Sequence, residues 1–229
     1  MQYVGGKYRI RKGLAAYLET VRNGRTFVEP FCGACNIIAE MTGRRIASDL
    51  CEDVIALWKS AVEGWEPPIS ISEEEYKAAR LLPASAYRGF VGFGCSFGGK
   101  FFGGYARNQR GDDFVRNARN SILRKAKNLN GVSFACCSYD SLLPENSLVY
   151  CDPPYANTTQ GYSSTKFDSA RFWQIMQEWA VRGNTVLVSE YAGPSFAEEV
   201  WRKETKIEMR STNGREVRIE KLFLVRQGS

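Results

Sequence analysis

Short apolar runs that alternate with helical stretches restrict the fold of this chain more than any other feature of its sequence. Each run is rich in β-branched residues and has the length of a buried strand. Strands that alternate with helices favour a mostly parallel sheet with helices on both faces. We expect strands at Thr26–Phe31, Arg45–Asp49, Val132–Cys136, Ser147–Cys151 and Thr185–Ser189, and helices over 14–21, 37–41, 53–62 and 172–181.

The last part of the chain follows a different pattern. Residues 206–209 and 217–225 are strand-like and flank Asn213-Gly214, a dipeptide typical of two-residue hairpin turns. We therefore expect the sheet to close with an antiparallel C-terminal hairpin at its edge.

Residues 88–127 interrupt the alternation. They hold nine Lys or Arg against two Asp, a net charge of +7, whereas the whole chain carries +6 and the remainder therefore −1. Cations interleaved with aromatic residues are typical of nucleic-acid contact. We expect a catalytic domain of residues 1–55 and 131–229, and a small, mostly helical insertion of residues 56–130. Within the insertion, Ser70–Glu75 predicts a capped helix start.

The composition excludes several kinds of chemistry. The 229 residues include no histidine, which excludes Ser-His-Asp and Cys-His catalysis and metal sites built on imidazole. No apolar run approaches the roughly 20 residues that span a bilayer, and the N-terminus has no signal-peptide pattern. The seven cysteines favour reduced thiols in a cytoplasmic protein. A zinc site of four thiolates has the wrong spacing in its second pair, so we expect no metal; its ligands would be Cys32, Cys35, Cys136 and Cys137.

The tetrapeptide Asp152-Pro153-Pro154-Tyr155 follows directly on the fourth expected strand. Ligands of open parallel sheets bind beyond the carboxyl ends of the strands, so this loop is placed for chemistry. Its prolines stiffen the loop, and the Asp152 carboxylate and Pro153 carbonyl can both accept hydrogen bonds from one exocyclic amino group. Tyr155 offers a flat face on which a base can stack. The alternative is a rigid turn without chemistry, but the Asp and Tyr on either side of Pro-Pro favour function.

Two acceptors at one amino group suit the methylation of that nitrogen. The amino nitrogen of adenine is a poor nucleophile because its lone pair is delocalised into the ring. Hydrogen bonds from both its protons would favour a pyramidal nitrogen, which could attack a methyl group held in line without a metal or a histidine. A base within a duplex must first be flipped out.

Two further segments suit a nucleoside cofactor. Gly33, in Glu29-Pro30-Phe31-Cys32-Gly33-Ala34-Cys35, allows a ligand close to the backbone, and a helix is expected just beyond it. Asp49 ends the second strand and can accept ribose hydroxyls or, equally, cap the next helix. Tyr3-Val4-Gly5-Gly6-Lys7 places a cation after two glycines, which suits the carboxylate of an amino-acid-bearing cofactor. Taken alone, that last segment would indicate a flexible N-terminus.

In this order, these segments resemble the class α, Dam-like adenine-N6 DNA methyltransferases over nearly the whole chain. The resemblance implies a Rossmann-like S-adenosylmethionine-dependent methyltransferase fold, with S-adenosylhomocysteine as a product and a flipped-out adenine as acceptor. It implies catalytic roles for Asp152, Pro153, Pro154 and Tyr155. The residues it assigns to the cofactor are Tyr3, Gly5, Gly6, Lys7, Glu29, Phe31, Gly33, Asp49, Ser138, Tyr139 and Asp152. Ser138 stands where the family usually has the Asp that contacts the cofactor's adenine, and Asp140 lies two residues further on.

The same resemblance places the target-recognition region in the insertion. The glycine-aromatic segment Cys95–Tyr105 is expected to lie against DNA, and Asn108-Gln109-Arg110-Gly111 to form a hairpin tip suited to base edges. The residues assigned to DNA are Lys100, Tyr105, Arg107, Asn108, Gln109 and Arg110. The remaining cations are expected to touch phosphate or to form a solvated helix face, among them Arg116, Arg119, Arg124, Lys125 and Lys127.

The expected partner is double-stranded DNA rather than a membrane. We expect a cytoplasmic monomer of bacterial, phage or mobile-element origin, with any cognate restriction nuclease on a separate chain. Alternatives are the same transfer to cytosine N4, to an RNA base or to a protein glutamine amide, and a non-catalytic DNA-binding relative. Asp152 as the first loop residue favours adenine, and intact Asp152 and Lys7 argue against the non-catalytic alternative. The insertion does not specify a target sequence, although GATC is the family habit.

Overall fold

A seven-stranded sheet with the order β3-β2-β1-β4-β5-β7-β6 organises the molecule. The computed structural model describes residue 1 and residues 3–154, 167–208 and 215–227, so Tyr155 and the expected Asn213-Gly214 turn lie outside the described residues. The strands are β1 (Thr26–Glu29), β2 (Arg45–Asp49), β3 (Val132–Cys136), β4 (Ser147–Cys151), β5 (Thr185–Ser189), β6 (Ala197–Glu208) and β7 (Arg215–Val225).

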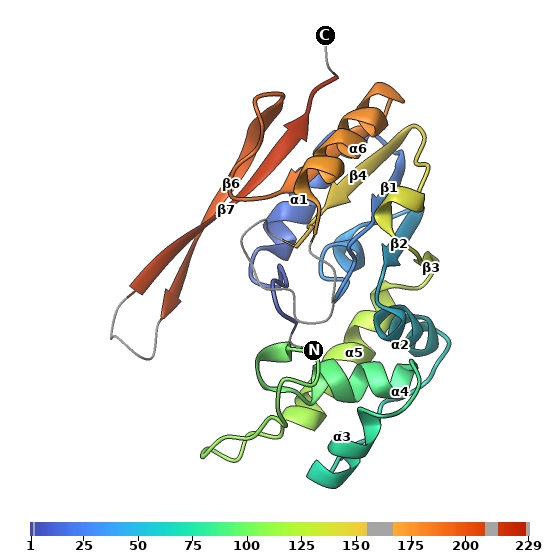
Figure 1. The fold of residues 1–229 in the computed structure, drawn as a ribbon, viewed down its shortest axis with the longest axis vertical. Helices are drawn as coiled ribbons and strands as arrows, with labels where there is room; N and C mark the ends of the chain where they lie inside the picture. Colours follow the sequence, from blue (N-terminus) through green and yellow to red (C-terminus); the bar gives the residue numbers. More distant parts are fainter. Residues whose placement is uncertain (2, 155–166, 209–214, 228–229) are drawn as a thin grey trace.

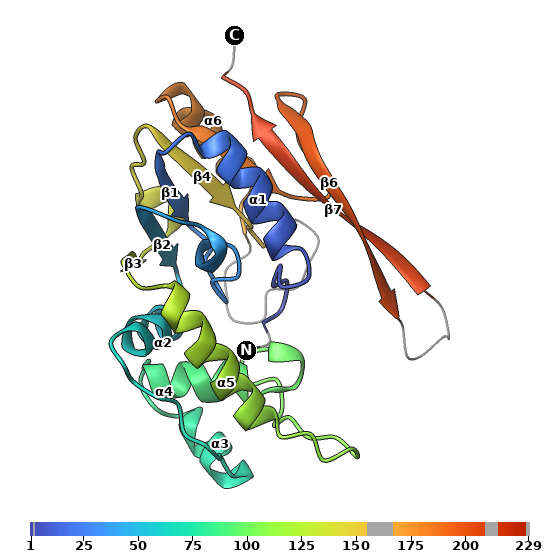
Figure 2. The same cartoon turned by 180° about the vertical axis from the view of Figure 1, so that it is seen from behind.

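The sheet is mostly parallel, as predicted. β3, β2, β1, β4 and β5 pair in parallel, whereas β7 runs antiparallel to both β5 and β6. The carboxyl ends of the parallel strands point toward the helical part of the chain (Figure 1). The β6–β7 ribbon extends past the sheet on the side to which the loop before α5 also projects (Figures 1 and 2).

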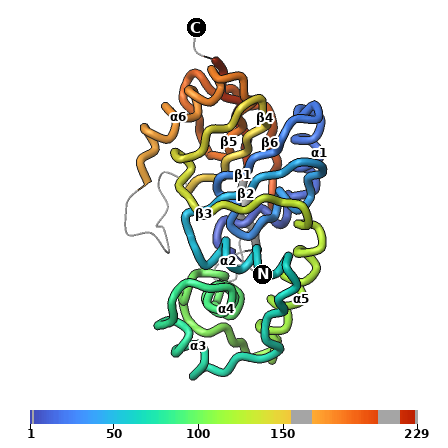
Figure 3. The backbone as a smooth tube through the Cα atoms, turned by 90° about the vertical axis from the view of Figure 1, so that its right-hand side faces the viewer, coloured from blue at the N-terminus to red at the C-terminus, as the bar shows by residue number. Residues whose placement is uncertain are grey.

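Helices lie on both faces of the sheet and form the insertion between β2 and β3 (Figure 3). The α-helices are α1 (Arg11–Arg22), α2 (Glu52–Val62), α3 (Glu73–Ala79), α4 (Ala86–Gly89), α5 (Phe114–Asn128) and α6 (Ser169–Val181). A π-helical turn, η2 (Phe90–Gly94), continues α4, and three 3-10 turns are η1 (Ile38–Glu40), η3 (Phe97–Gly99) and η4 (Tyr139–Ser141). Among the described residues, no helix is long and apolar enough to cross a membrane.

The middle residues of the central strands are apolar on both faces, as expected for strands covered on both sides. Successive residues alternate between two cores: Phe27 and Leu148 pack on the face with α1, and Val28 and Val149 on the face with α6. The first core continues beyond the sheet into α2, η2 and α5. The insertion is therefore joined to the sheet by continuous apolar packing, which restricts its movement against the sheet.

Three expectations about local structure need correction. Residues 37–41 form only the single turn η1, because Arg45 takes the Ile38 and Met41 carbonyls that a longer helix would have used. The first strand of the C-terminal hairpin begins at Ala197, well before the expected residue 206. Residues 108–111 form a turn with one isolated bridge, Ser96 to Tyr105, behind it, and no strand flanks that turn.

Other local expectations are confirmed. The bounds of β2, β3, β4 and β5 are those the sequence predicts. Ser72 caps α3: its hydroxyl accepts from the Glu75 N–H, and the Glu75 carboxylate accepts from the Ser72 N–H. The expected boundary after residue 55 falls within α2, so that helix belongs to both the sheet layer and the insertion.

Candidate active site

The candidate site lies where the strand order reverses. β1 has β2 on one side and β4 on the other, and chain connections leave in opposite directions there. Such a switch point is the usual ligand position of an open parallel sheet, beyond the carboxyl ends of the strands. Acidic side chains stand at three of these ends: Glu29 at β1, Asp49 at β2 and Asp152 just after β4.

Lys7 and Asp152 form an ion pair at the centre of this site. The Lys7 Nζ lies 2.8 Å from Asp152 Oδ1 and 3.5 Å from Glu220 Oε2, and the same ammonium donates to the Gly5 carbonyl at 3.4 Å. The Lys7 side chain is only 6% exposed. An ammonium this buried needs carboxylate partners, so the N-terminal segment is anchored in the site rather than a flexible terminus.

The Asp152 carboxyl is influenced by burial and by charges of both signs. Burial raises its pKa above the usual value, the Lys7 ammonium lowers it, and Glu220 and Glu190 raise it again. A lysine in direct contact therefore opposes the protonation that burial favours. Pro153 is buried and Pro154 is half-buried, and both hold the backbone at the start of the loop.

Asp49 and Gly33 clamp the loop after β1 to the end of β2. The Gly33 N–H donates to Asp49 Oδ2 at 2.9 Å, and the Cys51 N–H donates to Oδ1 at 3.0 Å. Burial raises the pKa of Asp49, and these N–H groups lower it. Asp49 thus does support the start of α2, as the structural alternative expected, while the same carboxylate faces the loop that we assign to the cofactor.

Gly33 adopts a conformation that few other residues tolerate. Its φ is +42°, and a Cβ built there would lie 2.8 Å from Cε1 of Tyr3. The Tyr3 ring packs between this glycine and Phe93 of the insertion, with ring centroids 5.0 Å apart. Gly6 is similarly restricted, because its Cβ would lie 3.0 Å from Asn36 Nδ2. At both positions a neighbouring side chain takes the space of a Cβ, Tyr3 at Gly33 and Asn36 at Gly6, so glycine lets the N-terminal segment pack closely on the loop after β1.

Glu29 is held beneath the loop. Its Oε2 accepts the Ile38 N–H at 2.9 Å, and its side chain is buried. Burial raises the pKa of Glu29 well above its usual value, an effect that the Ile38 N–H opposes and nearby Asp152 increases. The contact in the structure is therefore with the chain's own turn, and a direct contact between Glu29 and a cofactor stays a prediction.

Phe31 and Tyr139 lie together, although they are far apart in sequence. Their ring centroids are 5.2 Å apart, and both rings contact Phe172 of α6. Ser138 precedes η4, half-buried beside this aromatic group, whereas Asp140 is exposed. The structure thus brings Phe31 against Tyr139, with Ser138 next to it, beyond the ends of β1 and β3.

The residues assigned to DNA differ in how free they are. Gln109 and Arg110 are exposed, and so is Lys100. The Tyr105 hydroxyl donates to the Ile71 carbonyl at 2.7 Å, and Arg107 lies 3.0 Å from Glu73. The Asn108 amide oxygen accepts the Arg110 and Asp112 N–H groups, so that side chain builds its own turn.

The aromatic residues of the segment Cys95–Tyr105 mostly face inward. Phe101 packs on Phe93 with centroids 4.5 Å apart, and Phe102 packs on Tyr76 at 5.3 Å. Phe97 is the exception among them, with 67% of its surface exposed. The expectation that this whole segment lies against DNA is therefore reduced, on the geometry, to Phe97 and the nearby Lys100.

The cations of the insertion are not one solvated face. Arg88 pairs with Asp53, Arg119 with Glu66 and the Pro67 carbonyl, and Arg116 with Asp113. Lys125 departs furthest from the expectation: it turns inward to the Ala34 carbonyl and to Asn36 Oδ1, the latter at 2.7 Å. Its pKa is lowered to about 8, chiefly by burial.

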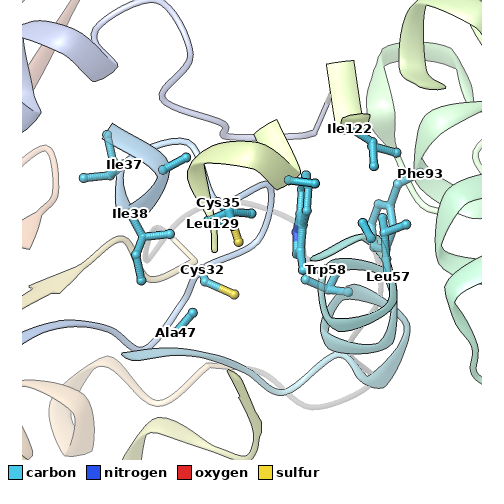
Figure 4. Close-up of a cluster of buried hydrophobic side chains, with 14 of the residues drawn as sticks. Cys32, Cys35, Ile37, Ile38, Ala47, Leu57, Trp58, Phe93, Ile122 and Leu129 are labelled. Carbon is cyan, nitrogen blue, oxygen red and sulfur yellow. The ribbon is translucent and has the colours of Figure 1, made fainter. Parts of the chain in front are cut away.

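Sequence reasoning missed Glu220, Glu190 and Trp58. Glu220 reaches Lys7 from β7, and Glu190, which directly follows β5, raises the pKa of Asp152. Trp58 of α2 donates from Nε1 to the Gly33 carbonyl at 2.8 Å. Figure 4 shows Trp58 between Cys35 and Leu129 on one side and Leu57 and Phe93 on the other. No sequence motif marks these residues.

The described residues contain no cluster of His, Cys, Asp or Glu able to hold a metal. All seven cysteines are free thiols. Cys32 and Cys35 are buried, and their mutual hydrogen bond together with burial raises the pKa of Cys32 well above its usual value. A protonated thiol is a poor metal ligand, and Cys136 is exposed whereas Cys32 and Cys35 are buried. The expectation that no metal is needed stays a prediction.

The strand order, the acidic strand ends and the glycine-clamped loop together define a Rossmann-like α/β protein of the methyltransferase type. The family model of the D12 class N6 adenine-specific DNA methyltransferases matches residues 3–90 and 82–212, and the chain belongs to this family. It is a DNA adenine-N6 methyltransferase, and its family implies S-adenosylmethionine as methyl donor and DNA as substrate. Adenine N6 is thereby favoured over cytosine N4, an RNA base or a glutamine amide.

One curated relative is the retron Ec67 DNA adenine methylase of Escherichia coli. It is 25% identical over 224 residues, which cover 82% of this chain and 75% of the relative. Among solved structures, an rRNA methyltransferase of Streptomyces viridochromogenes is 13% identical and covers 93% of this chain and 84% of its own, with a TM-score of 0.42. A precorrin-6y C5,15-methyltransferase of Geobacter metallireducens is 7% identical, covers 94% and 86%, and has a TM-score of 0.40. At these scores the two structures carry no argument about the substrate.

Proposed function

We propose that this methyltransferase acts on an adenine flipped out of double-stranded DNA, and that Asp152 and the Pro153 carbonyl hold its amino group. The observation that carries the proposal is the buried Lys7–Asp152 pair at the switch point of the sheet. Burial raises the pKa of Asp152, and the Lys7 ammonium in contact with the carboxyl favours its ionised form, which is the form that accepts an N–H with both oxygens. Accepting both N–H groups of the adenine at fixed positions localises the nitrogen lone pair and orients it.

The residues present fit a nucleoside that carries an amino acid. Gly33 and Gly6 let the N-terminal segment and the loop after β1 pack closely together, Asp49 offers a buried carboxylate to ribose hydroxyls, and Lys7 offers a cation to the amino-acid carboxylate. Tyr3, Gly5, Glu29, Phe31, Ser138, Tyr139 and Asp152 complete the cofactor set that we propose. When bound, S-adenosylmethionine supplies an electrophilic methyl group on its sulfonium, and S-adenosylhomocysteine is what remains.

The insertion, residues 56–130, is proposed to read the DNA. Gln109 and Arg110 at the exposed turn suit base edges, because Arg pairs well with guanine and Gln with adenine. Phe97 is exposed next to Gly98 and Gly99, where an aromatic face suits a stacked base. Lys100 and Arg107 suit phosphate contacts beside them.

Further proposals follow from the DNA substrate. We propose that the protein works as a monomer in the cytoplasm, where its DNA lies, and that it needs no metal. A cognate restriction nuclease, if one is paired with it, is a separate polypeptide. Tyr155, which lies outside the described residues, remains the proposed stacking surface for the extruded base.

The test is transfer of labelled methyl from S-adenosylmethionine to DNA, followed by digestion to nucleosides. Label in N6-methyladenine is the expected result, with EDTA present to show that no metal is needed. Label on cytosine would overturn the assigned acceptor, and absence of label in DNA would overturn the activity. Sequencing that detects modified adenines, on DNA from a host that expresses the chain, then identifies the target sequence.

A further inference from the structure

Lys125, on α5 of the insertion, places its ammonium group against the loop after β1. Its Nζ donates to the Ala34 carbonyl and to Asn36 Oδ1, 2.7 Å away, across 91 and 89 residues of sequence. The ammonium also lies 5.2 Å from the ring centroid of Trp58. Ala34 and Asn36 are both buried, at 3% and 7% exposure. A charge-assisted contact of this kind is among the stronger hydrogen bonds in a protein.

The two peptide carbonyls next to the Gly33–Asp49 clamp are therefore both held by the helices beyond it. Trp58 of α2 takes the Gly33 carbonyl and Lys125 of α5 takes the Ala34 carbonyl. The next residue, Cys35, has a φ of +51°, which is uncommon for a residue with a side chain. Such a loop needs external contacts to keep its shape, and Lys125 supplies the one that comes from the far end of the insertion.

Asn36 extends the same contact toward the N-terminal glycines. Its side chain lies against Gly6, where a Cβ would come within 3.0 Å of Nδ2. Lys125 thus fixes Asn36 between the loop after β1 and the segment that carries Lys7. Both segments contribute residues that we assign to the cofactor.

α5 itself is anchored at both ends. Asp113 caps its first turn, directly after the turn of residues 108–111, and Arg45 of β2 takes the carbonyls of Asn128 and Asn130 at 2.7 Å each. Phe114 and Lys125 are separated by about 17 Å along the helix axis at 1.5 Å per residue. A rigid helix therefore connects the exposed turn to the loop after β1.

We propose that Lys125 is a positioning residue for cofactor binding, supplied by the recognition insertion, which holds Ala34 and Asn36 so that Gly33 meets Asp49 before the cofactor arrives. This inference rests on the proposed function, because it takes the loop after β1 as part of the cofactor site. The charged or titratable groups around Lys125 are the Cys35 thiol in the loop after β1, Glu29 of β1, Glu40 of η1, Arg11 of α1 and the amino group of Met1. None of them replaces it, because Lys125 is the donor to both Ala34 and Asn36.

The first experiment measures the ligand-free protein. Lys125→Met keeps the length of the side chain and removes its donors, so amide hydrogen exchange over residues 33–36 should become faster than in the wild type. Lys59→Met is the matched control: Lys59 is exposed on α2 next to Trp58 and should leave this exchange unchanged. Equal exchange over residues 33–36 in Lys125→Met and the wild type would overturn the inference.

The second experiment measures affinity for S-adenosylhomocysteine by calorimetry, together with KM and kcat. Lys125→Met should raise Kd and the KM for S-adenosylmethionine about tenfold to a hundredfold, the loss expected for a hydrogen bond to a charged group. kcat at saturating cofactor and the affinity for DNA should stay within about twofold. Asn36→Ala should act in the same direction, and its effect should not add to that of Lys125→Met, because the two residues act through one contact.

The outcomes separate this inference from the proposed function. If the wild-type protein binds no S-adenosylhomocysteine and transfers no methyl group, the proposed function fails, and the cofactor role of Lys125 fails with it. If the wild type binds and both variants bind equally well, only the inference is overturned. If Lys125→Met does not fold, Asn36→Ala decides, since it removes one acceptor and leaves α5 intact.

Discussion

Asp152 illustrates at the scale of a single residue how the fold prepares a carboxylate for chemistry. Burial alone would favour the protonated acid, and Lys7 at 2.8 Å opposes that tendency. Glu220 contributes twice, because it pairs with Lys7 and also raises the pKa of Asp152. One ammonium, Lys7, contacts two carboxylates, Asp152 and Glu220. The direction in which a substitution of these residues changes the pKa of Asp152 can therefore be predicted.

Replacing Asp152 should remove activity. Asp152→Ala deletes an acceptor in a buried site and should lower the single-turnover rate of methyl transfer at least about 10²-fold. Asp152→Asn keeps one oxygen acceptor and should retain weak activity. Glu145→Ala, at an exposed position, serves as the control. A wild-type rate in Asp152→Ala, measured with labelled S-adenosylmethionine and DNA, would refute the role that we assign.

Replacing Glu220 should shift the pH dependence of the reaction. Activity that depends on the Asp152 carboxylate is lost as the pH falls through the pKa of that group. Because Glu220 raises this pKa, Glu220→Gln should move the acid limb of the pH–rate profile to lower pH. Glu63→Gln, at an exposed position of the insertion, should leave the limb in place. If the acid limb of Glu220→Gln lies at the wild-type pH or at higher pH, Glu220 does not raise the pKa of Asp152.

Glu29 should affect the stability of the fold. Its pKa in the folded protein is raised well above 4.5, so its favourable contribution is complete below about pH 4.5 and is lost as the pH rises through the folded-state value. Glu29→Gln keeps an acceptor for the Ile38 N–H and removes the buried charge. The free energy of unfolding in urea should be higher than that of the wild type at pH 7, and the difference should shrink toward pH 4.5. A difference that grows on acidification would be the wrong sign.

At the scale of elements, local sequence signals succeeded where the responsible contacts are local. Apolar runs in the central sheet and the capping box of α3 depend on residues within a few positions of one another. The prediction of a helix over residues 37–41 was wrong because the responsible contact is not local. Arg45, from the next strand, binds the Ile38 and Met41 carbonyls, and only the short turn η1 forms. Gly33 could likewise be recognised from its local sequence as a loop glycine. Trp58 could not, because its contact with the Gly33 carbonyl comes from α2, 25 residues further along the chain.

The capping box gives a prediction at this scale. Ser72→Ala removes the hydroxyl that accepts the Glu75 N–H at 3.1 Å, and should lower the free energy of unfolding by about 1 kcal/mol. Ser70→Ala, exposed and ahead of α3, should change it by less than about 0.5 kcal/mol. Urea denaturation followed by circular dichroism measures both. Equal stability of the two variants would mean that the cap does not stabilise α3.

At the scale of the whole molecule, the excess positive charge is distributed less freely than the sequence indicates. Of the nine Lys and Arg in residues 88–127, five are engaged within the chain: Arg88, Arg107, Arg116, Arg119 and Lys125. Lys100, Arg110, Arg124 and Lys127 are exposed, and no ion pair involves them in this fully described segment. Affinity for DNA should still fall with salt, but only free cations release counterions in full.

Substitutions of two arginines test the difference between exposed cations and cations that are paired within the chain. Arg110→Ala should reduce the slope of log K for DNA against log salt by about 0.9, the value for one phosphate contact, or relax base preference if it reads a base. Arg119→Ala removes a side chain already bound to Glu66 and Pro67, and should leave the slope unchanged while lowering stability. Fluorescence anisotropy at several salt concentrations measures the slopes. A larger change of slope for Arg119→Ala than for Arg110→Ala would contradict this division.

The sequence by itself determined the parallel sheet, the antiparallel C-terminal edge, and the positions of Lys7, Gly33, Asp49 and Asp152 along the chain. These follow from apolar periodicity, from glycine and proline, and from the rule that ligands bind at the carboxyl ends of strands. Only the tertiary structure decided that Lys7 pairs with Asp152 and Glu220, and that Lys125 turns inward to the loop after β1. The physical reason is that a long flexible cation has the same local sequence whether it meets water or a buried oxygen. Its partner is chosen by packing between segments that lie about 90 to 210 residues apart, which no local pattern records.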